Sequence, residues 1–262
     1  MGRRAAFIDL DKTLIPGSSL FLLARGLYAR DIYRVWDIVK FAWAQALFRA
    51  SGSEREAGSR MARESALSFI TGRSREELRG WGRELVEERI IPSVYEGMVH
   101  IVERHRAAGD ETYLVTAAPQ ELAEIVCEEL GMTGAVGTRA ELDPLGRYTG
   151  RLDGPVVHGP AKADAVQALA AERGIDLWAS AAYSDSMNDL PLLEAVGEPH
   201  AVNPDYRLRQ LANDRGWSVH EFRHRRVALL VGIPSALAGG ILFGAGVAVG
   251  MAAANRRARS AR

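Results

Sequence analysis

The chain has 262 residues, of which 47% are hydrophobic and 25% are charged, and its 33 Lys and Arg residues balance 33 Asp and Glu residues. This composition is that of a folded globular protein and excludes a largely disordered chain. A formal net charge of zero also excludes a strongly basic protein, so we expect no nucleic-acid partner. Any anion that the protein binds must be bound by local groups.

The N-terminal segment combines a short apolar run with two acidic residues. Residues 5–8 read Ala-Ala-Phe-Ile and predict a buried strand of a parallel sheet, and Asp9 and Asp11 follow it directly. Hydrolysis of a phosphate monoester needs a nucleophile and a proton donor, and two carboxylates aimed differently supply both. Taken alone the pair is a weak indication, because acidic residues at a strand end often only cap the next turn.

A long segment, residues 16–92, separates this strand from the next one. Its apolar and aromatic residues recur at helical spacing, as at Leu20 and Leu23. We therefore expect a helical cap over the strand ends, inserted into a core made of residues 1–15 and 93–222. A cap that excludes water suits the hydrolysis of a bound phosphate better than a subdomain that only adds stability.

Strand alternates with helix in the rest of the body. The further predicted strands are residues 112–115, 178–183 and 200–202, and the predicted helices are residues 120–130, 162–172, 190–195 and 205–214. This alternation predicts a parallel α/β sheet. Residues 140–152 predict a separate β-hairpin, because a Pro and a Gly stand between two short extended runs. Ligands of open parallel sheets bind at the carboxyl ends of the strands.

Polar residues at these strand ends add to the acidic pair. Thr116 offers a hydroxyl, and the backbone N–H groups that follow it, beginning at Ala117, to a phosphoryl oxygen. Lys162 begins a predicted helix and supplies positive charge to the transition state. Asp185 and Asp189 bring two more carboxylates to a third strand end, an oxygen-rich setting that Mg²⁺ prefers.

The order of the motifs resembles that of the haloacid dehalogenase superfamily, and within it the subfamily IB hydrolases typified by phosphoserine phosphatases. The motifs are IDLDKT, LVTAAP, the lysine of GPAK and YSDSMNDLPLL, and the resemblance covers residues 5–220. It implies a Rossmann-like parallel sheet core with an inserted helical cap. It also implies a phosphatase that depends on Mg²⁺ and forms a phospho-aspartate intermediate.

The resemblance assigns roles to the first motif. Asp9 would be the nucleophile and a metal ligand. Asp11 would be the general acid and base, and would also ligate the metal through its carbonyl. Because dehalogenases and transport ATPases of this superfamily lack an acid at the position of Asp11, a phosphatase is favoured, with a mutase as the alternative.

The later motifs receive roles in the same way. Thr116 and Lys162 would bind the phosphoryl group, and Asp185 would be the third protein ligand of Mg²⁺. Asp189 would support the metal or Lys162 from just outside, and Asn188 would contact the substrate.

Three departures from the phosphoserine enzymes concern specificity. Residues 17–19 read Gly-Ser-Ser where those enzymes carry the acidic cap residue that holds the substrate amine. Residues 116–118 read Thr-Ala-Ala in place of Ser-Gly-Gly, and residues 184–186 read Ser-Asp-Ser in place of Gly-Asp-Gly. These changes spare the catalytic groups and leave phosphoserine specificity open.

The C-terminal segment, residues 223–262, contains an uncharged run at residues 227–254 with arginines on both sides. About 20 apolar residues span a bilayer, so we expect a transmembrane helix rather than a core helix of the body. Gly240 and Gly244 are four residues apart and predict self-association of such helices. Because the body has a single cysteine and no secretory signal, we expect it at the cytoplasmic membrane, with the catalytic part facing the cytoplasm. A single span and a re-entrant hairpin both fit.

Two classes of function fit these observations. The first is a magnesium-dependent phosphatase acting on a phosphate monoester, and the second is a catalytically idle binding protein that is tethered to the membrane. The complete motif set favours the enzyme. The C-terminal segment favours a lipid-linked phosphate as substrate, and a soluble metabolite such as phosphoserine is the alternative.

Overall fold

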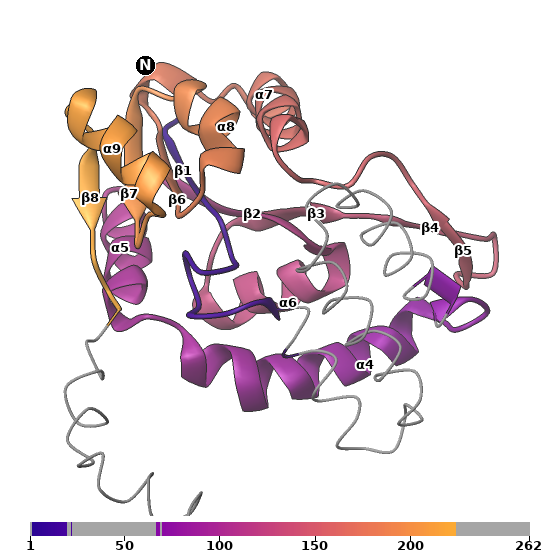
Figure 1. Ribbon diagram of the computed structural model, residues 1–262. Helices are drawn as coiled ribbons and strands as arrows, with labels where there is room; N and C mark the ends of the chain where they lie inside the picture. Colours follow the sequence, from indigo (N-terminus) through magenta and orange to yellow (C-terminus); the bar gives the residue numbers. More distant parts are fainter. Residues whose placement is uncertain (1, 20–21, 23–66, 69, 224–262) are drawn as a thin grey trace, which may run out of the picture. The chain divides into compact units, whose positions relative to one another are not determined.

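The computed structural model describes residues 2–19, 22, 67–68 and 70–223 (Figure 1). The chain divides into two compact units, Met1–Phe222 and Arg223–Arg262. All the helices and strands named below belong to the first unit. Most of the predicted cap, the predicted membrane segment and the Gly240/Gly244 pair lie outside the described residues. Within the described residues, no helix is both long enough and apolar enough to cross a membrane.

A six-stranded sheet forms the centre of the first unit, and every pair of neighbouring strands in it is parallel. Its strands, from one edge to the other, are β3 (Gly134–Thr138), β2 (Glu111–Pro119), β1 (Ala5–Ile8), β6 (Ala181–Ser184), β7 (Glu198–Val202) and β8 (Ser218–His220). The predicted parallel α/β sheet is thereby confirmed. The structure adds β3 and β8, one at each edge, which the sequence pattern did not indicate.

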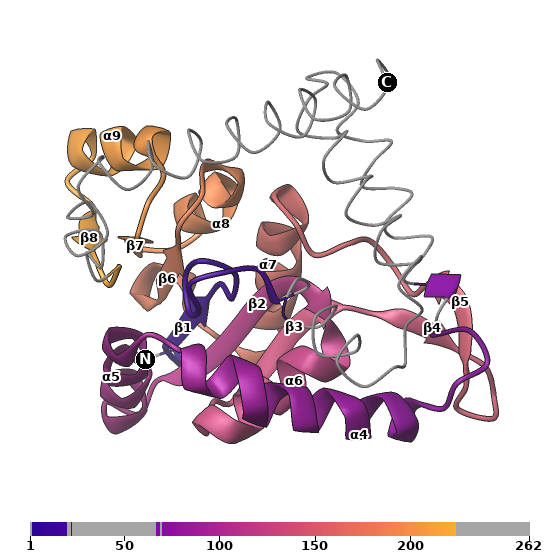
Figure 2. The same ribbon diagram turned by 60° about the horizontal axis from the view of Figure 1, so that its bottom comes forward.

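Helices cover both faces of this sheet (Figures 1 and 2). One face carries α5 (Glu96–Ala107) and α6 (Gln120–Leu130), with α4 (Arg75–Leu85) packed against α6. The other face carries α7 (Pro160–Arg173), α8 (Leu190–Glu194) and α9 (Tyr206–Asp214). The shorter helical turns are Val86–Ile90, Ile91–Ser93, Leu177–Ala179 and Met187–Asp189.

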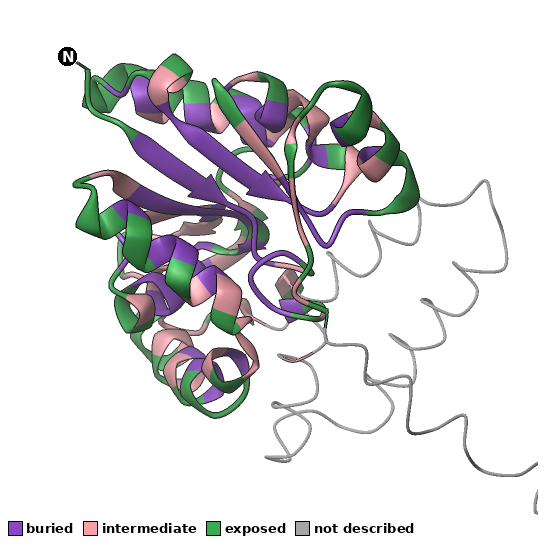
Figure 3. Ribbon diagram, turned by 90° about the vertical axis from the view of Figure 1, so that its left-hand side faces the viewer, coloured by how far each residue is buried: buried purple, intermediate pink, exposed green. Residues whose placement is uncertain are grey.

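Each face of the sheet has its own hydrophobic core because successive side chains of a strand point to opposite faces. In β1, Ile8 joins the cluster under α5 and α6, and Phe7 joins the cluster under α7, α8 and α9. Both side chains are fully buried, and Figure 3 shows the strands as a buried layer between the helices. Complete burial of such a side chain stabilises the fold by about 1.5–3 kcal/mol.

The strand β6 begins later than the sequence pattern predicts. Trp178 lies in the helical turn Leu177–Ala179 and is 84% exposed, and the strand begins at Ala181. The side chain of Asp176 caps this turn, since its Oδ1 accepts the N–H of Trp178 at 3.0 Å. The apolar pattern therefore predicts a strand at residues 178–180, where the structure has the end of a capped turn instead.

The predicted hairpin is confirmed as β4 (Ala140–Leu142) paired with antiparallel β5 (Tyr148–Leu152). Asp143 closes its turn, because its Oδ1 accepts the N–H groups of Leu145 and Arg147, both at 2.9 Å. Backbone hydrogen bonds join Tyr148 to Gly72 and Arg73, near the end of the long segment that follows β1. This segment is thus attached to the hairpin.

A second attachment lies between α4 and α6. Arg79 pairs with Glu124 at 2.9 Å and Arg83 pairs with Glu128 at 2.7 Å. Ser74 caps the start of α4, since its hydroxyl accepts the N–H of Glu77. The end of the long segment therefore packs on the same face of the sheet as α5 and α6.

Candidate active site

The registers of the central strands bring their polar ends to one edge of the sheet. Ile8 of β1 lies level with Leu114 of β2 and with Tyr183 of β6. β1 and β6 therefore end side by side while β2 continues past them to Pro119, and the N–H of Asp9 donates to the carbonyl of Tyr183 at 3.0 Å. Thr116, within β2, and Asp185, directly after β6, each lie two residues beyond the partners of Ile8.

Asp9 is buried, and a different side chain holds each of its carboxylate oxygens. Its Oδ1 lies 2.5 Å from Nζ of Lys162, and its Oδ2 accepts the hydroxyl of Thr13 at 3.0 Å. Two contacts fix the plane of the carboxylate. The side chain is therefore oriented before any substrate arrives, which is what a nucleophile needs.

Lys162 also binds Asp189, which makes it the centre of a buried group. Its Nζ lies 2.7 Å from Oδ2 of Asp189, and the same oxygen accepts the hydroxyl of Ser184 at 2.8 Å. Lys162 lies in the first turn of α7, whose N-cap residue, Gly159, has a positive φ of 58°. That left-handed conformation favours glycine and turns the chain into the helix.

The charges of this group do not balance. Asp9, Asp185 and Asp189 are all buried, and Lys162 is the only buried Lys or Arg among the described residues. Burial, with smaller contributions from Asp189 and Asp185, raises the pKa of Asp9 to about 7 against the opposing effect of Lys162. Burial would lower the pKa of Lys162, but attraction by Asp9 and Asp189 outweighs this effect and the pKa is raised.

A divalent cation fits this excess of negative charge. The groups that surround Asp9, apart from Lys162, offer oxygen atoms, which are the ligands that Mg²⁺ prefers. Within the described part of the chain no three His, Cys, Asp or Glu side chains are grouped closely enough to form a metal site by themselves. A site here would therefore combine two carboxylates, such as those of Asp9 and Asp185, with other oxygen ligands such as the carbonyl of Asp11.

Asp11 points toward the start of the long segment. Its Oδ1 accepts the N–H of Ser19 at 2.7 Å, and its side chain is partly exposed. Lys12, the next residue, has a positive φ of 63° and donates its N–H to the carbonyl of Gly17. This tight loop orients the carboxylate of Asp11 and leaves it partly open to solvent, as a proton carrier requires.

The remaining predicted residues lie at the same edge of the sheet, outside the hydrogen-bonded group around Lys162. Thr116 is buried, and its hydroxyl accepts the N–H of Ala118 at 3.1 Å. Ala117 is exposed, and its carbonyl accepts the hydroxyl of Thr138 at 2.9 Å. Asn188 is exposed, and its backbone N–H donates to Ser186.

Two hydroxyl residues of the site received no role from the sequence. Thr13 binds Asp9, and Ser184 binds Asp189. Both could have been proposed from their places in the motifs, because Thr13 ends the first motif and Ser184 directly precedes Asp185.

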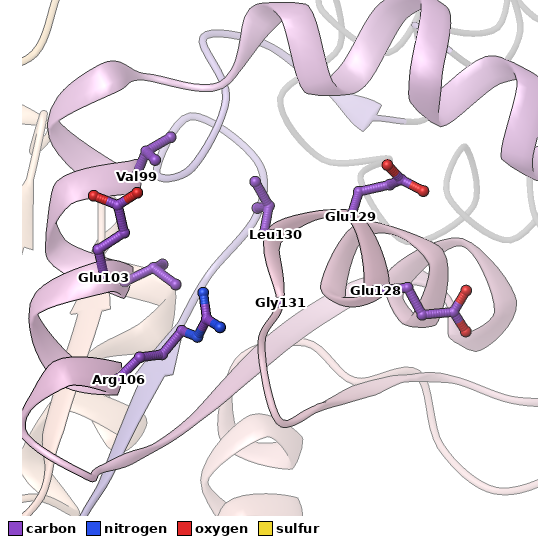
Figure 4. Close-up of a pocket in the computed structure, with 8 residues that line it drawn as sticks. Val99, Glu103, Arg106, Glu128, Glu129, Leu130 and Gly131 are labelled. Carbon is purple, nitrogen blue, oxygen red and sulfur yellow. The ribbon is translucent and has the colours of Figure 1, made fainter.

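A surface hollow of about 380 Å³ lies elsewhere, between α5 and the end of α6 (Figure 4). Its charged residues are Glu103, Arg106, Glu128 and Glu129. Gly134, a few residues after α6, lies level with Tyr113 near the start of β2, so the hollow faces the amino edge of the sheet. It is therefore separate from the group around Lys162.

The sequence and the fold are similar to those of known proteins. A family model described as haloacid dehalogenase-like hydrolase matches residues 6–194. A Mycobacterium tuberculosis protein named phosphoserine phosphatase is 44% identical over 255 residues, which cover 97% of this chain and 82% of that protein. A Neisseria meningitidis protein named histidinol-phosphatase is 39% identical over 160 residues, which cover 60% of this chain and 72% of that protein.

A solved structure agrees with the fold. A Bordetella pertussis protein of unknown function is 32% identical, with a TM-score of 0.73 over 85% of this chain and 100% of that chain.

Proposed function

The chain belongs to the haloacid dehalogenase-like hydrolase family, and from this premise we propose that it is a magnesium-dependent phosphatase that hydrolyses a phosphate monoester through a phospho-aspartate on Asp9. The observation that carries the proposal is the buried group of Asp9, Lys162 and Asp189, in which negative charge exceeds positive charge. A nucleophilic carboxylate, a fixed ammonium and a place for a cation are what transfer of a phosphoryl group requires.

The reaction has two steps. In the first, an oxygen of Asp9 forms a bond to phosphorus, the bond from phosphorus to the ester oxygen breaks, and Asp11 gives its proton to the leaving alcohol. In the second, Asp11 takes a proton from water, the water oxygen attacks phosphorus, and Asp9 leaves as a free carboxylate. Lys162 stabilises the charge on the phosphoryl oxygens in both steps.

Mg²⁺ would be held by the carboxylates of Asp9 and Asp185 and by the carbonyl of Asp11, with Asp189 in support. Its contribution would be electrostatic, because a cation held there would screen the repulsion between the carboxylate of Asp9 and the anionic phosphate. Thr116 and the N–H of Ala117 would bind phosphoryl oxygens, and Asn188 would contact the rest of the substrate.

The substrate is a small-molecule or lipid phosphate ester. The uncharged segment at residues 227–254 favours a lipid-linked phosphate, because a membrane anchor would hold the catalytic site near lipid substrates. The names of the relatives favour the alternative, a soluble metabolite such as phosphoserine. A phosphatase panel that contains both kinds of ester separates the two.

Turnover of an aryl phosphate tests the proposal. We expect hydrolysis with Mg²⁺, loss of hydrolysis in EDTA, and recovery when Mg²⁺ is restored in excess. The competing function, a tethered binding protein without catalysis, predicts no hydrolysis under any of these conditions. A rate that is unaffected by EDTA would contradict the dependence on Mg²⁺.

We further propose that residues 227–254 anchor the protein in the cytoplasmic membrane, with residues 1–222 on the cytoplasmic side and with self-association through Gly240 and Gly244. After gentle lysis without detergent, the full chain is expected in the membrane fraction. Deletion of residues 223–262 should release an enzyme that still hydrolyses small esters, because every proposed catalytic residue precedes the deletion. Recovery of the full chain in the soluble fraction would refute the anchor.

A further inference from the structure

We propose that Thr138, at the end of β3, is a positioning residue that fixes the end of β2, residues 116–119 (hereafter the phosphate-binding loop), relative to the helix that carries Lys162. The inference rests on the proposed function, because it deepens the role of the phosphoryl-binding groups. Thr138 belongs to none of the motifs in the sequence and contacts no reacting atom.

The hydroxyl of Thr138 joins two segments that are far apart in the chain. It donates its hydrogen to the carbonyl of Ala117 at 2.9 Å, and it accepts the N–H of Val157 at 3.2 Å. Ala117 directly follows Thr116 in the phosphate-binding loop. Val157 is buried and lies two residues before Gly159, the N-cap of α7. A single oxygen thus connects the phosphate-binding loop with the segment that leads to α7, and both would bind the phosphoryl group.

The hydrogen bond from Thr138 to Ala117 orients the backbone of the phosphate-binding loop. A hydrogen bond to the carbonyl of Ala117 fixes the peptide plane between Ala117 and Ala118, whose N–H donates to the hydroxyl of Thr116. The loop also departs from regular pairing, since the register between β2 and β3 shifts between Val115 and Pro119. Because regular pairing is interrupted between Val115 and Pro119, the hydroxyl of Thr138 supplies a bond to Ala117 in the irregular stretch.

The neighbouring glycine shows how closely β3 approaches this loop. A Cβ at Gly137 would lie 2.8 Å from Cα of Gln120 and 3.0 Å from the carbonyl oxygen of Ala118. The N–H of Gly137 also donates to Oε1 of Gln120 at 2.6 Å. The end of β3 therefore lies directly against the backbone of the loop, and only a residue without a side chain fits at position 137.

Position 138 also lies at the base of the hairpin excursion. Residues 139–156 leave the sheet at Thr138 and return at Val157, and a second bond, from the N–H of Asp153 to the carbonyl of Arg139, closes the same base. Thr138 is therefore the point at which β3, the hairpin, the loop and the approach to α7 meet. Loss of its hydroxyl would let the loop and Lys162 move independently.

The test compares Thr138→Val, which keeps the shape and removes the hydroxyl, with Thr138→Ser, which keeps the hydroxyl. The probe is inorganic phosphate as a competitive inhibitor of aryl phosphate hydrolysis. The loss of one hydrogen bond weakens a binding constant by roughly threefold to tenfold. We expect Thr138→Val to raise both KM and the inhibition constant of phosphate by about that factor, and Thr138→Ser to stay near the wild type.

A second pair of variants tests the loop without touching the hydroxyl. Gly137→Ala should weaken phosphate inhibition because its Cβ displaces the loop backbone. The control is Gly80→Ala, since a Cβ at Gly80 meets nothing within 4 Å, and it should leave inhibition unchanged. If Thr138→Val loses thermal stability but binds phosphate as Thr138→Ser does, the residue is only structural and the inference is overturned. A wild-type protein that neither hydrolyses phosphate esters nor binds phosphate would overturn the proposed function as well.

Discussion

Asp9→Asn is expected to lower kcat by about 10⁴-fold or more, because an amide keeps the shape of the side chain and cannot act as the nucleophile. The same variant should fold normally. The pKa of Asp9 is raised to about 7 from 3.8, so its ionisation costs stability as pH rises from about 4 through about 7. Without Mg²⁺ at pH 8, the variant should therefore be at least as stable as the wild type, as thermal unfolding will show.

The control for this change is Asp176→Asn. Asp176 caps the turn Leu177–Ala179 at the amino end of β6, far along the strand from Asp185, and an Asn caps a turn nearly as well as an Asp. This variant should retain wild-type kcat. A retained kcat in Asp9→Asn would remove Asp9 from the mechanism, and an equal loss in both variants would mean that the assay reports folding.

Lys162→Met is expected to lower both stability and activity. Removal of the ammonium leaves the carboxylates of Asp9 and Asp189 buried without their common partner, and the loss of one member of a buried ion pair costs about 3–5 kcal/mol. Loss of the charge that stabilises the transition state should lower kcat by about 10²-fold to 10³-fold. Denaturant unfolding and kinetics with saturating Mg²⁺ measure the two effects.

A second substitution separates the two effects. Lys162→Met combined with Asp189→Asn removes one of the uncompensated carboxylates and should recover part of the lost stability. Activity should stay low, because the positive charge at the phosphoryl group is still missing. Recovery of activity together with stability would show that Lys162 acts only by holding the fold.

The sheet could be predicted from the sequence where its strands are strongly apolar. The run that became β1 and the strand ends at Asp9 and Asp185 were visible because a buried parallel strand is apolar throughout. The sequence pattern did not predict β3 or β8. β3 contains two glycines, which weaken strand propensity, and β8 has only three residues at the sheet edge. The parallel order of all six strands follows from the helical crossovers.

The site could be predicted as a set of residue types but not as a set of contacts. The motifs predicted carboxylates and a lysine, and the structure places the ammonium of Lys162 between Asp9 and Asp189. No sequence pattern indicates which oxygen a lysine meets across such a chain separation. The role of Thr138 could not be predicted either, because its partners are main-chain groups, which every residue type offers.

The most direct measurement of the central claim is the position of the phosphoryl group during turnover. Rapid acid quenching of the enzyme with a phosphate ester and Mg²⁺, followed by peptide mass spectrometry, should find one added phosphoryl group on the peptide that contains Asp9. The adduct should be absent from Asp9→Asn. Hydrolysis without any phosphorylated peptide, or a phosphoryl group on another residue, would contradict a phospho-aspartate at Asp9.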